Sequence, residues 1–160
     1  MAEGSKGTLP VNDDEADVGF QERIAVPRTI VSRPYREDRK TGAIRWLDKP
    51  AEHDYPAAAS YLTLIFPPKI AEALVGELKQ APISCFKARD IVRASGLSLV
   101  GVSNSRVEKH RQKIMRGENL SPLLLVRNPP TACVIVADGY HRLCSIYGVD
   151  EDALIRCQIV

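Results

Sequence analysis

Regular spacing of apolar and polar residues begins near residue 57 and continues to the end of the chain. The apolar run Tyr61–Phe66, closed by two prolines, predicts a strand. Apolar residues at helical spacing then predict a helix over 69–81 that Pro68 can start. The same spacing predicts two further helices, each closed by a glycine, over 86–96 and 105–117.

The C-terminal part of the chain predicts three strands and one helix. An apolar run after Pro122 and a second run over 133–137 predict two strands, and the prolines and polar residues between them predict a turn. Apolar residues at helical spacing then predict a short helix that ends at Gly148. Residues 153–160 alternate between apolar and polar side chains, which predicts a closing strand.

These elements predict an α+β fold, with a small mixed sheet and packed helices in a single domain over 57–160. Residues 1–20 are polar, acidic and poor in large apolar side chains, so we expect them to be disordered. Residues 21–56 are irregular and rich in proline. We expect a partly ordered arm there that can wrap the core or join copies of the chain into a homo-oligomer.

The distribution of charge says more than the total. The net charge is only +2, but Lys87–Arg116 holds eight basic residues and two acidic ones. A local excess of this kind suits an anionic partner, although a solvated helix face would have the same composition.

Several classes of site are not indicated. No apolar run approaches the ~20 residues of a membrane span, and the N-terminus lacks the apolar core of a signal peptide, so we expect a cytoplasmic protein with no membrane partner. The four cysteines form no CxxC pair and are expected to be reduced and buried. The three histidines are not at zinc-ligand spacing, so no metal site is predicted.

One short stretch places basic side chains where a strand is predicted to turn into a helix. Val134–Ala137 predicts a buried strand, Asp138 and Gly139 predict a turn, and His141 and Arg142 then fall in the first turn of the helix. That end of a helix already carries partial positive charge from its unpaired N–H groups. Two more donors there favour an anion opposite them.

The chemistry of this stretch suits a phosphate or nucleotide. Gly139 lets the backbone approach a ligand closely, so that its N–H group and those of Tyr140 and its neighbours can hold phosphate. Arg142 can grip phosphate with two hydrogen bonds, and His141 can donate to it or move a proton. Asp138 has two interpretations: a helix N-cap, which we favour, or a functional carboxylate.

Residues 121–160, which read SPLLLVRNPPTACVIVADGYHRLCSIYGVDEDALIRCQIV, resemble the core of the ParB/sulfiredoxin superfamily. ParB-like domains commonly carry Asp-Gly, any residue, His-Arg and then an apolar residue, and this sequence has the same residues at Asp138, Gly139, His141, Arg142 and Leu143. With the helix predicted at 105–116, the resemblance covers about residues 100–160.

The resemblance implies a nucleotide-phosphate site at the glycine-basic turn. Members of the superfamily include CTP-dependent DNA-partitioning clamps, sulfiredoxins that use ATP, kinases for free serine and ParB-like nucleases. Magnesium would accompany a nucleotide, although the sequence shows no dedicated metal cage. Tyr140 stands where a sulfiredoxin has its catalytic cysteine. The partitioning proteins have arginines in the turn and a downstream DNA-binding domain, whereas this sequence has His141 and Arg142 and ends at Val160.

The sequence leaves the activity open. As an enzyme of the phosphotransfer or nuclease type, the protein would use His141 and Asp138 as its catalytic candidates. The alternative is a non-enzymatic DNA-binding or regulatory protein that uses the basic segment 87–116, part of which superficially resembles a helix-turn-helix. In either case four residues of the predicted helix are candidates for accessory contacts to an anion or to DNA: Arg106, Lys109, His110 and Lys113.

Overall fold

The computed structural model describes residues 44–160, and these residues form a mixed α+β fold. The predictions for 1–20, and for the part of the 21–56 arm before residue 44, lie outside the described residues. In chain order the elements are α1 (Asp54–Leu62), α2 (Pro68–Gln80), β1 (Ile83–Lys87), α3 (Ala88–Ser95), α4 (Ser105–Met115), β2 (Leu123–Asn128), a 3-10 turn (Pro129–Thr131), β3 (Cys133–Asp138), α5 (Tyr140–Val149) and β4 (Leu154–Ile159).

The four strands form one mixed sheet in the order β1-β4-β2-β3. The pairs β1–β4 and β2–β3 are antiparallel, while β2 and β4 run parallel in the middle. A bulge interrupts the β2–β3 ladder, because Leu124 pairs with Asp138 while Leu125 pairs with Val136. Bulges redirect the side chains that follow them, and this one lies immediately before Gly139.

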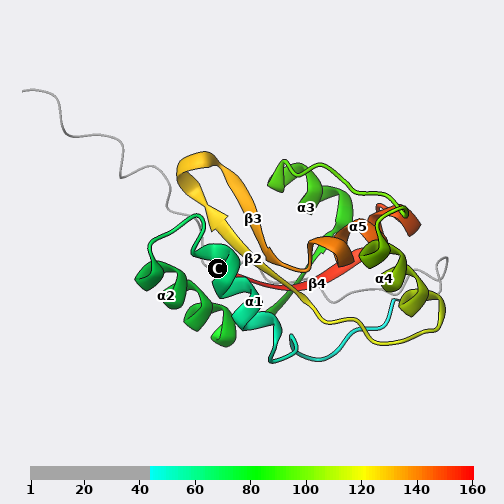
Figure 1. Cartoon of the computed structure of the whole chain (residues 1–160), viewed down its shortest axis with the longest axis horizontal. Coiled ribbons are helices and arrows are strands. Elements are labelled where there is room, and N and C mark those ends of the chain that lie inside the picture. The colour runs from blue at the N-terminus through cyan, green and yellow to red at the C-terminus, as the bar shows by residue number, and fades with distance from the viewer. Residues whose placement is uncertain (1–43) are drawn as a thin grey trace, which may run out of the picture. The chain divides into compact units, whose positions relative to one another are not determined.

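Helices cover both faces of this sheet (Figure 1). Strand β2 shows the division most clearly, since its side chains alternate between the faces. Leu123 and Leu125 pack in a core with α3 and α5, whereas Leu124 and Val126 pack in a second core with α1 and α2. Because β2 is buried on both faces, it is a continuous apolar run rather than an alternating one.

The strand predicted at Tyr61–Phe66 is wrong. Tyr61 and Leu62 end α1, and the following residues form turns that lead to Pro67 and α2. The helical spacing of Tyr55, Ala58 and Leu62, all three buried, was present in the sequence and explains the helix.

The other sequence predictions need two smaller corrections. Residues 83–87 form the edge strand β1, so the predicted helix over 86–96 begins only at Ala88. Helix α5 continues through Gly148 to Val149 and is capped by Asp150 instead. The three C-terminal strands, the helix after Pro67 and the helix capped by Asn104 are confirmed.

Part of the predicted arm packs on the core. Trp46 makes a single parallel bridge with Leu120, and both belong to the core that includes α5. Helix α1 begins at Asp54, so it extends across residue 57, where the domain was predicted to start.

Candidate functional site

The turn between β3 and α5 has the geometry that its sequence predicts. His141 and Arg142 lie in the first turn of α5, directly after Gly139. Gly139 is the N-cap, with φ of 99°, and no side chain caps the helix. The predicted N-cap role of Asp138 is therefore wrong: the carboxylate precedes the cap and makes another contact. The first N–H groups of α5 have no partner within the helix, so they can bind an anion.

Glycine is required at position 139 for two separate reasons. Its φ lies in the left-handed region that residues with a side chain rarely adopt. A Cβ atom there would also lie 2.7 Å from Cγ of Leu123 and 3.1 Å from Nη2 of Arg142. The backbone of the turn thus packs directly on the core and on the guanidinium.

Arg142 is buried and holds two carboxylates together. Its Nη2 donates to Asp138, the last residue of β3, and lies 3.4 Å from Oδ2 of Asp54, which is 88 residues away in the chain. Its Nε is buried without a hydrogen-bond partner among the described residues. The phosphate grip expected of Arg142 stays a prediction, since both of its recorded polar partners are carboxylates.

Asp54, the second carboxylate beside Arg142, was not predicted from the sequence. Asp54 is buried at the first position of α1, accepts a hydrogen bond from Ser121 and lies 3.3 Å from Nε2 of His53. Ser121 in turn accepts from the backbone N–H of Ala51. The alanines after Asp54 indicate a helix that starts there. They do not indicate that Asp54 pairs with Arg142, because no local pattern links the two residues.

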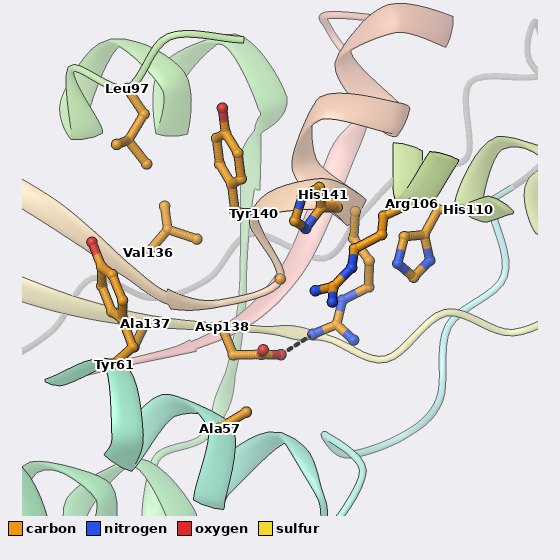
Figure 2. Close-up of a pocket in the computed structure, with 12 residues that line it drawn as sticks. Ala57, Tyr61, Leu97, Arg106, His110, Val136, Ala137, Asp138, Tyr140 and His141 are labelled. Atoms are coloured by element: carbon orange, nitrogen blue, oxygen red, sulfur yellow. Dashed lines mark hydrogen bonds and ion pairs between the residues drawn. The ribbon is translucent and has the colours of Figure 1, made fainter. Parts of the chain in front are cut away.

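All of the candidate residues except Lys109 and Lys113 line one open pocket of about 630 Å³. Figure 2 shows Arg106 and His110 of α4 beside His141 of α5, with Asp138 below them. The other side of the pocket is apolar. Its wall combines Val136 and Ala137 of β3, which directly precede the turn, with two segments that the sequence did not connect with the site: Ala57 and Tyr61 of α1, and Leu97 of the α3–α4 loop.

Both histidines of the pocket have lowered pKa values. Burial is the main cause for His110, followed by repulsion from Arg142, Lys113, His141 and Lys109, and together these lower its pKa to about 4. Its Nδ1 is buried and has no hydrogen-bond partner among the described residues. Burial and then Arg106 lower the pKa of His141, and Asp138 partly opposes them. Both imidazoles are therefore neutral near pH 7.

Asp138 has a raised pKa. Burial of its side chain is the largest cause, and nearby Asp54 adds to it, while the charge and hydrogen bond of Arg142 act in the opposite direction. A half-buried carboxylate in a pocket beside an imidazole has the character expected of an acid or base.

Five of the eight basic side chains in segment 87–116 already have ion-pair partners. Salt bridges join Lys87 and Arg89 to Asp152, Arg93 to Asp90, Arg111 to Glu108 and Arg116 to Glu118. Among the described residues, no ion pair is recorded for the other three basic residues of the segment, all on α4: Arg106, Lys109 and Lys113. Of these Arg106 lines the pocket, while both lysines lie close enough to influence the pKa of His110.

The α3–α4 connection does not form a helix-turn-helix turn. Residues 96–104 separate the two helices, whereas that motif joins them by about 3–4 residues. The loop packs on the site instead, because the hydroxyl of Tyr140 donates to the carbonyl of Ser98. Tyr140 thus fastens the loop to the first turn of α5.

Among residues 44–160, no group of three or more potential ligands is placed to hold a metal ion, and no helix is long and apolar enough to cross a membrane. Comparisons of the chain with protein-family models, with curated proteins and with solved structures find no match. The site is therefore interpreted from its own geometry.

Proposed function

We propose that this protein binds a nucleotide or a related phosphorylated small molecule in the pocket lined by α1, β3, α4 and α5. The observation that carries the proposal is the convergence of an uncapped helix N-terminus with three nitrogen-bearing side chains, Arg106, His110 and His141, on one wall of the pocket. Backbone N–H groups, a guanidinium and imidazoles are the usual partners of phosphate oxygens in proteins.

The opposite wall supports a nucleotide rather than phosphate alone. Tyr61, Leu97 and Val136 present apolar surface across the pocket from the nitrogen-bearing side chains (Figure 2). An aromatic ring beside aliphatic side chains suits a planar base, and the volume of the pocket is in the range of ligand sites. The ParB/sulfiredoxin resemblance of the Asp138–Leu143 motif points to the same ligand class.

Arg142 has a supporting role in this proposal. Because Nη2 of Arg142 is held by Asp138 and Asp54, Arg142 stabilises the turn at Gly139. Arg106 is the exposed guanidinium that meets the phosphates. Asp138 then lies close enough to serve as a base for a hydroxyl group of a second substrate, with His141 as the other candidate for proton transfer. Magnesium would arrive with the nucleotide phosphates.

Calorimetric titration with CTP, ATP and ADP tests the binding site. We expect at least one of them to bind, and we expect Arg106→Gln to weaken that binding by about tenfold, since a charge-assisted hydrogen bond is lost. Arg116→Gln is the matched control, because Arg116 caps the other end of α4. Absence of binding by all three nucleotides, or equal affinities of the two variants, contradicts the proposal.

The alternative, DNA binding through segment 87–116, has less support, because five of its eight basic side chains are in ion pairs. A gel-shift assay at two salt concentrations distinguishes it. Salt-sensitive binding of duplex DNA that is lost on neutralising Arg106, Lys109 and Lys113 would favour the alternative.

A further inference from the structure

The pocket offers little net positive charge to a ligand as long as its imidazoles are neutral. Arg142 is paired with Asp138 and lies beside Asp54, so one guanidinium serves two carboxylates. Arg106 is the other arginine of the pocket lining, so two guanidinium charges face two carboxylate charges there; Lys109 and Lys113 lie near His110 but outside the lining. A ligand with two negative charges therefore needs further cations from within the site.

Two imidazoles are placed to supply them. His110 of α4 and His141 of α5 lie on the same wall of the pocket as Arg106 (Figure 2). Nδ1 of His110 is buried and has no hydrogen-bond partner among the described residues. A buried polar atom of this kind is costly to leave without a hydrogen-bond partner, and His110 lines the pocket in which a ligand would lie.

We propose that His110 and His141 take up protons from solvent when a phosphate dianion enters the pocket, so that the site selects terminal phosphate monoesters over phosphodiesters. This inference rests on the proposed function and names its substrate class. No bond of the ligand is made or broken: each imidazole gains a proton and becomes a donor to a phosphate oxygen. A phosphodiester carries a single negative charge and cannot stabilise two protonated imidazoles in the same way.

The electrostatic surroundings give the direction of the effect. His110 faces Lys109 and Lys113 on its own helix and Arg142 and His141 on α5, and burial together with these groups lowers its pKa to about 4. A dianion between these groups cancels their repulsion, so it raises the pKa of the imidazole toward and above its ordinary value. Binding and protonation then favour each other.

This coupling predicts a pH dependence of a definite sign. As pH falls from about 8 to 6.5, protons become more available while a phosphate monoester, whose second pKa is about 6, stays largely dianionic. The affinity for the monoester therefore rises over this range. Affinity for a diester should change little, because neither partner gains charge.

Adenosine 5′-monophosphate and 3′,5′-cyclic AMP are suitable probes, since they share a base and sugar but differ in phosphate charge. Calorimetry at pH 7.5 in two buffers of different ionisation enthalpy counts the protons taken up. We expect up to two protons for each bound AMP, one for each imidazole, and at least tenfold weaker binding of cyclic AMP. His110→Gln should remove about one of these protons and weaken AMP binding by about tenfold, because glutamine is polar but cannot be protonated.

His53→Gln is the control, since the side chain of His53 is 85% exposed and lies outside the pocket lining. Thermal unfolding of each variant establishes that it is folded. Four outcomes overturn this inference while leaving the proposed function intact. They are AMP binding without proton uptake, uptake that is unchanged in His110→Gln, cyclic AMP binding as tightly as AMP, and binding of CTP but not of AMP. Failure of AMP, CTP, ATP and ADP alike contradicts the proposed function itself.

Discussion

At the scale of single residues, Gly139 connects the fold to the site. Its left-handed φ turns β3 into α5, and its missing side chain lets Leu123 and Arg142 contact the turn. The same backbone therefore packs on the core and starts α5 at the edge of the pocket. Fold stability and ligand binding should depend on this residue together.

Gly139→Ala tests that dependence. We expect a loss of about 1–3 kcal/mol in the free energy of unfolding, because alanine is strained at this φ and its Cβ would collide with Leu123. Gly148→Ala, in the same helix with open space around it, should instead stabilise the protein by about 0.5–1 kcal/mol. Urea denaturation of both variants measures the difference. Equal stabilities would show that the turn does not need glycine.

At the scale of elements, the loop over residues 96–104 belongs to the site rather than to a DNA-binding motif. Leu97 lines the pocket, and Tyr140 reaches from α5 to the carbonyl of Ser98. Beyond this contact the loop leaves Leu99 and Val102 partly exposed. One exposed hydrogen bond thus joins the loop to the helix end where we place the phosphate.

Tyr140→Phe should loosen the loop without unfolding the protein. The hydroxyl is lost but the ring stays, so we expect a change in global stability of at most about 1 kcal/mol, together with faster amide exchange over residues 97–102. Hydrogen–deuterium exchange measures this effect. Tyr147→Phe, about two turns further along α5, is the control. Unchanged exchange in Tyr140→Phe would mean that the loop is held by its apolar contacts instead.

At the scale of the whole described structure, the site depends on a contact between segments far apart in the chain. Asp54 starts α1, Arg142 lies in α5, and Ser121 precedes β2, so their network joins elements from both faces of the sheet. Because Asp54 and Arg142 are both buried, their pairing is less screened than a surface salt bridge.

Asp54→Asn should therefore destabilise the fold by about 1.5–3 kcal/mol, since Arg142 loses one of its two carboxylates in a buried place. Asp90→Asn removes the exposed partner of Arg93 and should change stability by less than about 1 kcal/mol. Thermal or urea unfolding compares them. The buried network would have no special importance if both substitutions had the same small effect.

Elements whose signals are local could be predicted from the sequence alone. Asn104 and the glycines at 96 and 117 mark helix ends, Pro122 precedes an apolar strand, and the Asp138–Arg142 stretch turns a strand into a helix, because caps, turns and periodicity act over a few residues. The prediction failed at Tyr61–Phe66, where a short apolar run fits either a strand or the end of a helix.

Only the tertiary structure decided how the site is assembled. The pairing of Arg142 with Asp54, the apolar wall formed by Tyr61 and Leu97, and the placement of His110 opposite α5 all join segments that are distant in sequence. Such contacts depend on how helices pack on the two faces of the sheet, and periodicity within one element carries no information about them. The strand, turn and helix that carry His141 and Arg142 were therefore predictable, whereas the electrostatic balance of the pocket around them was not.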